Sequence, residues 1–392
     1  MSLIQHSGAI MAFQPRIRRG AFLEAAWRHG CRKFSVYNRT YISTNFADPV
    51  DEYWKVIRDV AIWPVMGERQ VEISGPDAQA FVDYLTPRNM QNCAVGQCKY
   101  ALITAPDGGI VSDPIILRVD QDRFWLSTSD CDLELWARGV AVGSTFDVAT
   151  RDAEVSVIQV QGPKSPRLMA ALFGDAVLDL RYYWVMSADF MGHPLQISRT
   201  GWSGEFGYEI YLENASQGDA LFEALMEAGR PSGVAPGAVN HIRRIESGIL
   251  SWGVDMTLNE NPFEIGLGRL VELDGSTADF VGRAALEALR DQPLQKKLVG
   301  LELDGAALAH NETPWPLFDG AHTVGKLTSL AYSPRLEKNI AIGLVHPDYA
   351  ETGARMSVET WQGVRRATVI PMPFVPKSQN GSARALLSDA AV

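Results

Sequence analysis

The stretch SRTGWSGEFGYEI, residues 198–210, carries three glycines spaced three apart, two glutamates and three aromatic rings. Its GWSG core resembles the G-x-S-x-G turn of serine hydrolases, but the second glycine comes one residue early and no helix pattern follows. The spacing also differs from the G-x-G-x-x-G dinucleotide motif. The following YEIYLEN alternates, which predicts a strand with Tyr208 and Ile210 on one face and Glu209 on the other. Taken alone, the stretch is a glycine-rich turn that feeds either a site or a solvated edge strand.

The bulk composition is that of an ordinary globular chain. Its 392 residues exceed the usual size of one domain, so two or three domains are expected. The 46 acidic and 36 basic residues give a net charge of −10, which disfavours nucleic acid and anionic membranes as partners. No secretory leader and no run of about 18 apolar residues is recognisable, so a cytoplasmic location is expected. Met1 and Met11 are both candidate start residues.

Cysteine and histidine spacing predicts neither a disulfide framework nor a metal site. The four cysteines, at positions 31, 93, 98 and 131, are few for a chain of this length. Cys93 and Cys98 are separated by four residues rather than two, and no histidine lies near them in sequence. The seven histidines form no HxxxH pair, so we expect no metal.

A strand–turn–helix pattern occurs twice. Residues 71–85 alternate as a strand, break at SGPD and resume at helical spacing. Residues 155–173 repeat this order around Gly162-Pro163, which indicates an internal duplication or two related subdomains. Upstream, residues 51–62 have the apolar spacing of an amphipathic helix behind an acidic start.

The rest of the chain is dominated by strand and turn patterns. Residues 99–129 contain three strand-like runs divided by the turns DGG and DQD, which predict hairpins. After about residue 292 short strands predominate, which predicts a small β-domain. Within it GAHTVGKLT, residues 320–328, nearly matches the phosphate-binding P-loop but alternates as a strand. Residues 379–392 are small and polar, and we expect a flexible tail.

Six segments of this sequence, in the same order, resemble the folate-binding aminomethyltransferase family, whose founder is the T-protein of the glycine cleavage system. The resemblance covers residues 20 to 375, approximately. The segments are ERQVEISGPDA, KYALITAPDGGIVSDPII, SRTGWSGEFGYEIYL, IRRIESGILSWGVDM, NPFEIGLGRLVELD and KLTSLAYSPRLEKNIAIGLV. Within the family, four phrases are most similar to the dimethylsulfoniopropionate demethylases: RHGCRKFSVYNRTYISTNF, ERQVEISGPDA, DMTLNENPFEIGLG and AYSP.

The resemblance implies an α+β fold of the glycine cleavage T-protein type. This is a three-domain ring, or cloverleaf, with folate in the central hole and a C-terminal domain that is a β-barrel or jelly-roll-like. We expect the first folate-binding domain to combine residues 1–60 and 151–291, with a second α+β domain at 61–150. The C-terminal β-domain is expected at 292–378, followed by the tail at 379–392.

Two segments depart from the pattern of true T-proteins. PVMG, residues 64–67, stands where those proteins typically carry DVSH, and Ser112-Asp113 stands where they carry two adjacent aspartates. PVMG also differs from the demethylases and therefore bears on the choice of substrate. Folate-binding iron–sulfur assembly proteins share the fold but carry a KGCxxGQE-type signature, in which none of the cysteines here is placed.

By resemblance, Asp113 corresponds to the catalytic aspartate of the family. It precedes a predicted strand and is followed by Pro114, so its carboxylate can project into the mouth of a cleft. Methyl transfer from an onium centre to folate N5 needs N5 aligned and unprotonated, and a carboxylate can accept or relay that proton. Without the resemblance, the residue pattern favours a turn aspartate at position 113 over a catalytic one.

The resemblance also implies a set of tetrahydrofolate-binding residues. Glu209 corresponds to the glutamate that accepts two parallel N–H donors of the pterin ring. Aromatic rings can pack on the flat parts of folate, and Arg244 is implied to face the cleft although its helix position is equally that of a solvated charge. The implied cofactor-binding residues are Tyr100, Trp202, Glu209, Arg244, Trp252 and Glu264.

The donor that the resemblance implies is a small onium or N-methyl compound, with dimethylsulfoniopropionate the first to test. A sulfonium or quaternary ammonium cation is held by aromatic faces and a nearby carboxylate, and Tyr37 and Trp202 are the candidate cage. The leading prediction is a methyltransferase that forms 5-methyl-tetrahydrofolate. One alternative is an aminomethyltransferase that receives its group from a lipoyl carrier protein and releases ammonia; the other is a non-enzymatic folate-binding protein.

Overall fold

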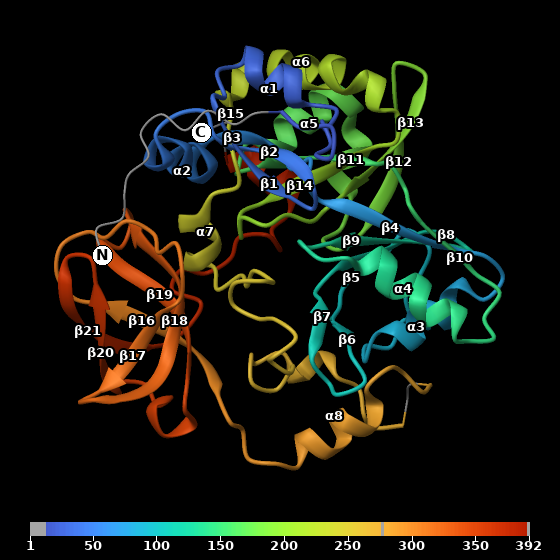
Figure 1. The fold of residues 1–392 in the computed structure, drawn as a ribbon. Helices are drawn as coiled ribbons and strands as arrows, with labels where there is room; N and C mark the ends of the chain where they lie inside the picture. Colours follow the sequence, from blue (N-terminus) through green and yellow to red (C-terminus); the bar gives the residue numbers. More distant parts are fainter. Residues whose placement is uncertain (1–12, 276–277, 390–392) are drawn as a thin grey trace.

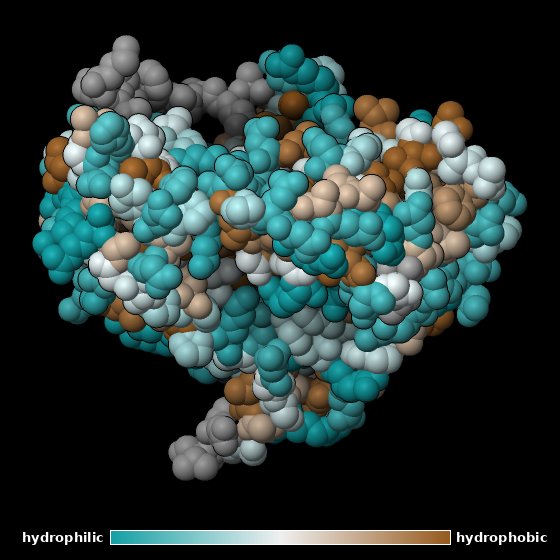
Figure 2. Space-filling view, turned by 90° about the horizontal axis from the view of Figure 1, so that it is seen from below, coloured by the Kyte–Doolittle hydropathy of each residue, from teal (hydrophilic) through white to brown (hydrophobic). Residues whose placement is uncertain are grey.

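The protein consists of three lobes grouped around a common centre (Figure 1). The computed structural model describes residues 13–275 and 278–389, so the candidate start residues Met1 and Met11 lie outside it. Two lobes are α+β units and the third is a β-barrel. No helix in the described part of the chain is long and apolar enough to cross a membrane. Hydrophilic residues prevail over the face in Figure 2, where hydrophobic residues form small separate patches.

The first lobe is built on a six-stranded sheet of order β12-β13-β14-β11-β3-β15. All neighbouring strands are antiparallel except β15 and β3. Residues from helices α1, α5 and α6 pack with Tyr208, Ile210 and Leu212 of the sheet in one buried apolar core. The elements are α1 (Leu23–Arg28), β1 (Lys33–Tyr37), β2 (Thr40–Asn45), α2 (Pro49–Arg58), β3 (Val60–Pro64), β11 (Ser156–Gln161), α5 (Ser165–Phe173), β12 (Val185–Phe190), β13 (His193–Ser198), β14 (Gly207–Leu212), α6 (Gly218–Gly229) and β15 (Val234–Pro236).

The second lobe has a five-stranded sheet of order β10-β4-β9-β8-β5. Helices α3 and α4 cover one face of it and share an apolar core with its strands. A two-stranded hairpin, β6 and β7, lies beside the sheet. The elements are β4 (Arg69–Ser74), α3 (Ala78–Leu85), β5 (Cys98–Tyr100), β6 (Ile103–Thr104), β7 (Ile110–Ser112), β8 (Ile115–Asp120), β9 (Arg123–Thr128), α4 (Leu133–Val142) and β10 (Ala149–Asp152).

The two α+β units repeat one plan, as the sequence predicted. Each begins with a strand and a helix and returns through three further strands, so β11-α5-β12-β13-β14 corresponds to β4-α3-β5-β8-β9. The turn between strand and helix contains Gly75 in one unit and Gly162 in the other, with φ angles of 127° and 123°. A Cβ atom at these positions would lie 2.6 Å from the Asp147 carbonyl oxygen and 2.5 Å from that of Asp59. Glycine is therefore required at both turns.

The units also exchange one strand each. β3 leads directly into β4 but pairs with β11, whereas β10 leads directly into β11 but pairs with β4. The helix predicted over 51–62 therefore ends at Arg58, and Val60–Pro64 form a strand that is buried along its whole length. The domain boundary expected after residue 60 falls at the start of this strand, which belongs to the sheet of the first lobe.

The third lobe is a closed six-stranded antiparallel barrel, which confirms the predicted C-terminal β-domain. Its strand order is β16-β19-β18-β17-β20-β21, and β16 pairs with β21 to close it. GAHTVGKLT lies within a strand hairpin, as its alternation predicted, and not at the start of a helix. The strands are β16 (Lys297–Leu303), β17 (Trp315–Asp319), β18 (His322–Ser333), β19 (Lys338–Val345), β20 (Arg355–Thr360) and β21 (Gly363–Ile370).

The segment between the α+β units and the barrel lies among the three lobes. It contains α7 (His241–Glu246) and, after a long irregular stretch, α8 (Arg283–Arg290). Apolar side chains of this segment form one cluster with residues of the second lobe and the barrel, among them Leu102, Ile245 and Ile342. The chain then returns from the barrel to the first lobe.

The C-terminal segment is more ordered than the sequence suggested. Residues 379–392 were expected to form a flexible tail, but α9 (Ala383–Asp389) lies within them. Ala383 is buried in the core of the first lobe, and Arg199 donates a hydrogen bond of 2.8 Å to the Gln379 carbonyl oxygen. Small residues with a few leucines can pack on an existing core even where they carry no strong signal of their own.

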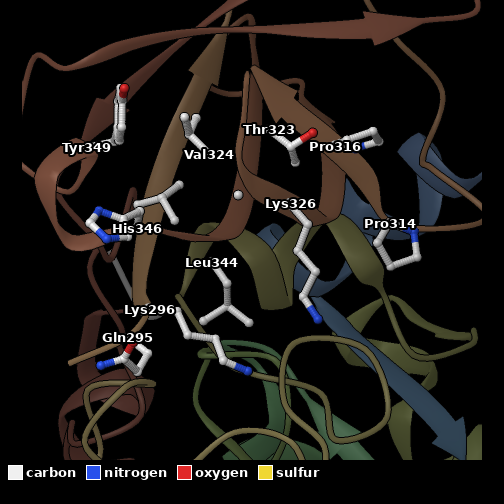
Figure 3. A pocket seen from close by; sticks show the side chains of 12 residues that line it. Gln295, Lys296, Pro314, Pro316, Thr323, Val324, Lys326, Leu344, His346 and Tyr349 are labelled. Atoms are coloured by element: carbon white, nitrogen blue, oxygen red, sulfur yellow. The ribbon is translucent and has the colours of Figure 1, made fainter. Parts of the chain in front are cut away.

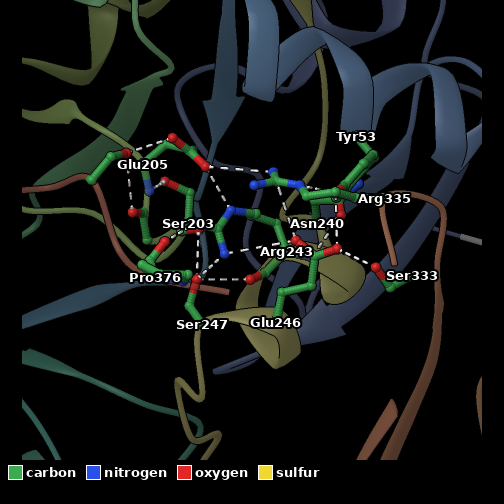
Figure 4. A network of polar contacts seen from close by, with 12 residues as sticks. Tyr53, Ser203, Glu205, Asn240, Arg243, Glu246, Ser247, Ser333, Arg335 and Pro376 are labelled. Carbon is green, nitrogen blue, oxygen red and sulfur yellow. Dashed lines mark hydrogen bonds and ion pairs between the residues drawn. The ribbon is translucent and has the colours of Figure 1, made fainter. Parts of the chain in front are cut away.

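A buried polar network around Arg243 links the lobes (Figure 4). The Arg243 side chain is fully buried, and its Nε donates to Glu205 Oε1 at 2.7 Å. Its Nη2 donates to the carbonyl oxygen of Pro376, in the segment that leaves the barrel, at 3.2 Å. The neighbouring Glu246 Oε1 accepts from Tyr53 of α2 at 2.8 Å and from Ser333 of the barrel at 2.6 Å.

We predict that Arg243→Ala strongly destabilises the protein. The substitution removes the buried ion pair of 2.7 Å with Glu205 and leaves that carboxylate only the longer pair of 3.9 Å with Arg335. Breaking a buried pair costs about 3–5 kcal/mol. Urea unfolding followed by fluorescence measures the change. Arg290→Ala is the control, because the Arg290–Asp291 pair is exposed and such pairs contribute about 1 kcal/mol or less. Equal midpoints for the two variants would contradict the prediction.

Candidate active site

Asp113 occupies the short turn between β7 and β8, where Pro114 separates the two strands. The phenol of Tyr100, at the end of β5, donates a hydrogen bond of 3.1 Å to Asp113 Oδ2. Burial raises the pKa of Asp113 to about 7, and the hydrogen bonds from Tyr100 and Ser129 limit that rise. This carboxylate is therefore poised between its charged and neutral forms near neutral pH, as suits a group that exchanges protons.

Tyr37, at the end of β1, interacts electrostatically with Asp113. Burial raises the pKa of its phenol well above the ordinary value, and the carboxylates of Asp113, Asp130 and Glu68 add to the effect. The segment PVMG, which differs from the family patterns, packs closely on this residue. A Cβ atom added at Gly67 would lie only 2.9 Å from the Tyr37 carbonyl oxygen. The one segment that departs from both family patterns thus forms part of the surroundings of Tyr37.

Arg244 is buried, which corrects the alternative view of it as a solvated helix charge. Its Nη1 forms an ion pair of 2.5 Å with Asp255 Oδ2, and the two side chains are 1% and 0% exposed. Its Nη2 donates to Ser329 of the barrel at 2.6 Å. The guanidinium carbon lies 5.6 Å from the centre of the Trp202 ring, within range of a cation–π contact. Asp255, in turn, acts electrostatically on Asp113.

Trp252 and Tyr100 are half-buried and pack against the same apolar cluster between the second lobe and the barrel. The Trp252 indole donates a hydrogen bond of 2.9 Å to the carbonyl oxygen of Ile110, in β7. Because β7 leads into Asp113, this hydrogen bond fixes the indole close to the turn that carries the carboxylate.

Glu209 is the centre of a second polar cluster, and only 3% of it is exposed. Its Oε1 accepts from Gln159 Nε2 at 2.6 Å, and its Oε2 accepts from the Tyr211 hydroxyl at 2.9 Å and from the Thr200 hydroxyl. Burial raises the pKa of Glu209, and these hydrogen bonds oppose the rise. The predicted strand is confirmed as β14, but it is a fully buried inner strand and not a solvated edge.

Glu68 is a partner that the sequence did not single out, although it lies within the quoted segment ERQVEISGPDA. Its Oε1 accepts a hydrogen bond from Ser127. Burial and then the Glu209 carboxylate raise the pKa of Glu68 to about 8. The side-chain oxygens of Gln70 and Gln159, in the same cluster, are buried and have no partner in the described structure. This cluster therefore contains two carboxyl groups, those of Glu68 and Glu209, and two amide oxygens without a hydrogen-bond partner.

Glu264 lies apart from these groups, against the barrel. It is 4% exposed, its Oε2 accepts from the Asn261 backbone at 3.2 Å, and its own carbonyl oxygen accepts from Leu298 of β16. Burial raises the pKa of Glu264, and the charge of Lys296 opposes that rise.

The expected site residues thus form a connected group with one outlier. Asp113 accepts a hydrogen bond from Tyr100, and electrostatic effects link it to Tyr37 and Asp255. Asp255 is paired with Arg244, which lies over the ring of Trp202. Glu68 links this group to Glu209, because it acts electrostatically on Tyr37 and the Glu209 carboxylate acts electrostatically on it. Among residues 13–275 and 278–389, no three His, Cys, Asp or Glu side chains are grouped so that they could hold a metal ion.

Comparisons with known proteins identify the family. Residues 22–275 match the model described as the GCVT N-terminal domain, and residues 296–376 match that of the glycine cleavage T-protein C-terminal barrel domain. The chain belongs to the glycine cleavage T-protein family. The predicted family and fold are confirmed, and with them the class of activity: a one-carbon transferase that uses tetrahydrofolate as co-substrate.

Individual relatives differ in their reactions. The dimethylsulfoniopropionate demethylase DmdA of Ruegeria pomeroyi is 36% identical over 354 residues, which are 90% of this chain and 96% of that protein. An aminomethyltransferase of Desulfitobacterium hafniense is 30% identical, over 84% of this chain and 90% of that protein. The crystal structure of the glycine cleavage system aminomethyltransferase T from Bartonella henselae has a TM-score of 0.82 at 22% identity and covers 92% of this chain and 99% of that one.

We predict that Tyr100→Phe raises the pKa of Asp113. The Tyr100 hydroxyl stabilises the charged carboxylate, so its removal favours the protonated form. Carbon-13 NMR of protein labelled at its aspartate carboxyls follows the titration, and Asp113→Asn assigns the signal. Tyr84→Phe, in α3, is the control and leaves the titration unchanged. An unchanged or lowered pKa in Tyr100→Phe would disprove the expected role of the hydroxyl.

We also predict that Glu68 makes stability depend on pH. A glutamate with an ordinary pKa of 4.5 and a folded pKa of about 8 binds more protons in the folded state, so stability falls as pH rises between these values. Glu68→Gln lacks this ionisation and gains stability relative to the parent from pH 5 to 8. Urea midpoints measured across that range give the difference. The exposed Glu24→Gln serves as the control, and parallel curves for Glu68→Gln and the parent would refute the prediction.

Proposed function

We propose that this protein is a tetrahydrofolate-dependent methyltransferase that demethylates a small onium or N-methyl donor. Dimethylsulfoniopropionate is the first donor to test, because the demethylase of Ruegeria pomeroyi is similar to this chain over 90% of its length. The observation that carries the proposal is the buried Asp113 carboxylate, which accepts a hydrogen bond from Tyr100 and acts electrostatically on Tyr37: an anion near aromatic side chains suits a methylated cation.

We propose that Tyr37 and Asp113 make the main contacts with the donor cation and that the ring of Trp202 forms a further wall of the cage. Arg244 already occupies one face of the Trp202 ring, and its positive charge repels a second cation on that face. Only the opposite face of Trp202 is therefore available to the donor. Tyr37 lies next to three carboxylates, which makes its surroundings negative.

The proposed reaction is a displacement in which the bond between the methyl carbon and sulfur breaks and its electron pair stays on sulfur. A bond forms between that carbon and N5 of tetrahydrofolate, and N5 loses its proton. Asp113 accepts this proton, directly or through water, because its pKa of about 7 leaves part of it ionised at neutral pH. The products are the demethylated thioether and 5-methyl-tetrahydrofolate.

The cluster around Glu209 suits the pterin ring of the co-substrate. Glu209 Oε1 has one hydrogen-bond donor and can accept another, and the nearby side-chain oxygens of Gln159 and Gln70 are buried without partners. The N–H groups of a pterin need such acceptors. We further propose that Tyr100, Trp202 and Trp252 pack on the flat parts of folate, and that Arg244 and Glu264 order the walls around it.

An aminomethyltransferase is the second candidate, since proteins of that name are 30% identical to this chain over most of their length. That reaction would require a lipoyl carrier protein as partner. The segment PVMG replaces the typical T-protein motif close to Tyr37 but also differs from the demethylases, so the donor panel decides between the two candidates. A cytoplasmic location is also proposed; the free cysteines of the described chain suit a reducing compartment.

A donor panel with tetrahydrofolate tests the proposal. We expect 5-methyl-tetrahydrofolate, detected by mass spectrometry, with a sulfonium or N-methyl donor and without a lipoyl protein. Tyr37→Leu should raise the donor KM about tenfold, since a desolvated cation–π contact contributes about 1–2 kcal/mol, whereas Tyr37→Phe keeps the ring and a near-parental KM. Aminomethyl transfer from a lipoyl carrier, with no methyl donor active, would overturn the proposal in favour of the second candidate.

A further inference from the structure

Asp113 takes up a proton in each turnover of the proposed reaction and must release it before the next. Bound folate and donor exclude water from the centre of the molecule, so the proton needs another way out. The side chains that hydrogen-bond to Asp113 are those of Tyr100 and Ser129. Burial raises the pKa of the Tyr100 phenol well above its ordinary value, so this hydroxyl holds its proton firmly. Ser129 is therefore the better route.

Ser129 begins a continuous row of hydroxyl and thiol groups. Its Oγ lies 3.1 Å from the Oγ of Ser112, at the end of β7. Ser112 Oγ lies 3.5 Å from Thr128 Oγ1, which in turn lies 3.2 Å from Cys131 Sγ. The Thr128 hydroxyl has the Ser129 carbonyl oxygen as an alternative acceptor at 3.1 Å. Either atom of each pair in the row can be the donor, and a proton relay requires such reversible hydrogen bonds.

The middle of this row is shielded from water, and its last member is not. Ser112 is 0% and Thr128 3% exposed, whereas Cys131 is partly exposed. Burial raises the pKa of the Cys131 thiol, although hydrogen bonds from Ser112 and its neighbours oppose the rise. Cys131 therefore stays protonated, and it can accept a proton at sulfur while it gives up its own.

Cys131 ends the row at a small pocket that reaches the protein surface. The side chains of Arg39 and Asp132 at this pocket are 69% and 58% exposed. Its volume of about 120 Å³ has room for several water molecules, since one needs about 10–15 Å³. The lining residues are Asn38, Arg39, Arg69, Asp130, Cys131 and Asp132.

A larger groove, of about 670 Å³, lies on the barrel strands β17, β18 and β19 (Figure 3). Lys296 and Lys326 at this groove converge on the buried carboxylate of Glu260. Tyr100 and Ser129, in contrast, both belong to the second lobe. The hydrogen bonds that start at Asp113 thus lead to the pocket beside Cys131 and not to the barrel groove.

We propose that this row of four side chains, the hydroxyl–thiol relay, carries the proton of Asp113 to water in the pocket. The inference rests on the proposed function, because that reaction delivers the proton from N5 of tetrahydrofolate to Asp113. Asp113 gives its proton to Ser129 while the Ser129 hydroxyl gives its own to Ser112. The same exchange follows at Thr128 and Cys131, and a water molecule takes up the last proton. No electron is transferred, Asp113 regains its charge, and each relay group keeps its number of protons.

Rapid-quench and steady-state kinetics of the full-length enzyme test the relay, with tetrahydrofolate and the donor that the parent demethylates. Ser112→Ala breaks the row but leaves Asp113 both of its side-chain hydrogen bonds. At pH 8 we expect a first turnover at the parental rate, because Asp113 with a pKa of about 7 begins mostly ionised. Later turnovers must wait for Asp113 to lose its proton, so kcat should fall about tenfold or more with unchanged KM values.

Cys131 offers a matched pair of variants for the other end of the relay. Cys131→Ala removes the last group and should lower kcat in the same way, whereas Cys131→Ser keeps a donor and acceptor and should retain the parental kcat. Ser144→Ala is the control, because this hydroxyl of the same lobe donates to the Ala141 carbonyl oxygen and not to the relay. Urea midpoints establish that the variants are folded.

The outcomes separate the relay from the proposed function. A parental kcat in both Ser112→Ala and Cys131→Ala overturns the relay, while methyl transfer by the parent still stands. Equal slowing of the first and the later turnovers also overturns it, because a structural disturbance around Asp113 acts on both. If the parent forms no 5-methyl-tetrahydrofolate from any donor, the proposed function and the relay fail together.

Discussion

The exchange of strands between the two α+β units is the constraint on which the site depends. Because β3 and β10 each complete the other unit's sheet, residues 65–68 and 153–155 cross from one sheet to the other. The two sheets enclose an apolar cluster that includes Trp63, Trp125 and Tyr211. Glu68 lies on the first crossing and Glu209 on the facing sheet, so the exchange itself brings the two acids together.

Two neighbouring arginines of α7 serve different parts of the molecule. Side chains one position apart on a helix diverge by about 100°, so Arg243 and Arg244 point to separate clusters. Arg243 joins α7 to the first lobe and to the segment that leaves the barrel, whereas Arg244 joins Asp255, Ser329 and the ring of Trp202. Both guanidinium groups are buried with carboxylate partners, which holds the surrounding side chains in one arrangement.

Much of this architecture was predictable from periodicity and order of motifs, but not the long-range pairings. The repeated strand–turn–helix pattern and the C-terminal β-domain were both apparent in the sequence. The exchange was not, since nothing local in VAIWP distinguishes a buried strand from the end of a helix. Its partner strands, β11 and β15, both lie far along the chain.

The same distinction holds for the candidate site. The resemblance directed attention to Asp113, Glu209 and the aromatic residues, and the structure brings most of them together. Glu68 and Asp255 lie within the same quoted motifs, but their roles became apparent only from their spatial neighbours. Glu68 interacts with Glu209, and Asp255 pairs with Arg244. The burial of Arg244 likewise depends on Asp255 and on Ser329 of the barrel, which no helical periodicity reveals.

The return of the chain from the barrel to the first lobe has a consequence for access. The barrel is attached through the segment that precedes β16, and its exit is held by hydrogen bonds from Ser378 to the Gly204 carbonyl oxygen and from Arg199 to Gln379. A domain tethered at one end can swing freely about that point, whereas a domain held at both ends can move only about the axis through its two attachments. Any opening of the barrel away from the first lobe is therefore restricted to rotation about its two attachments.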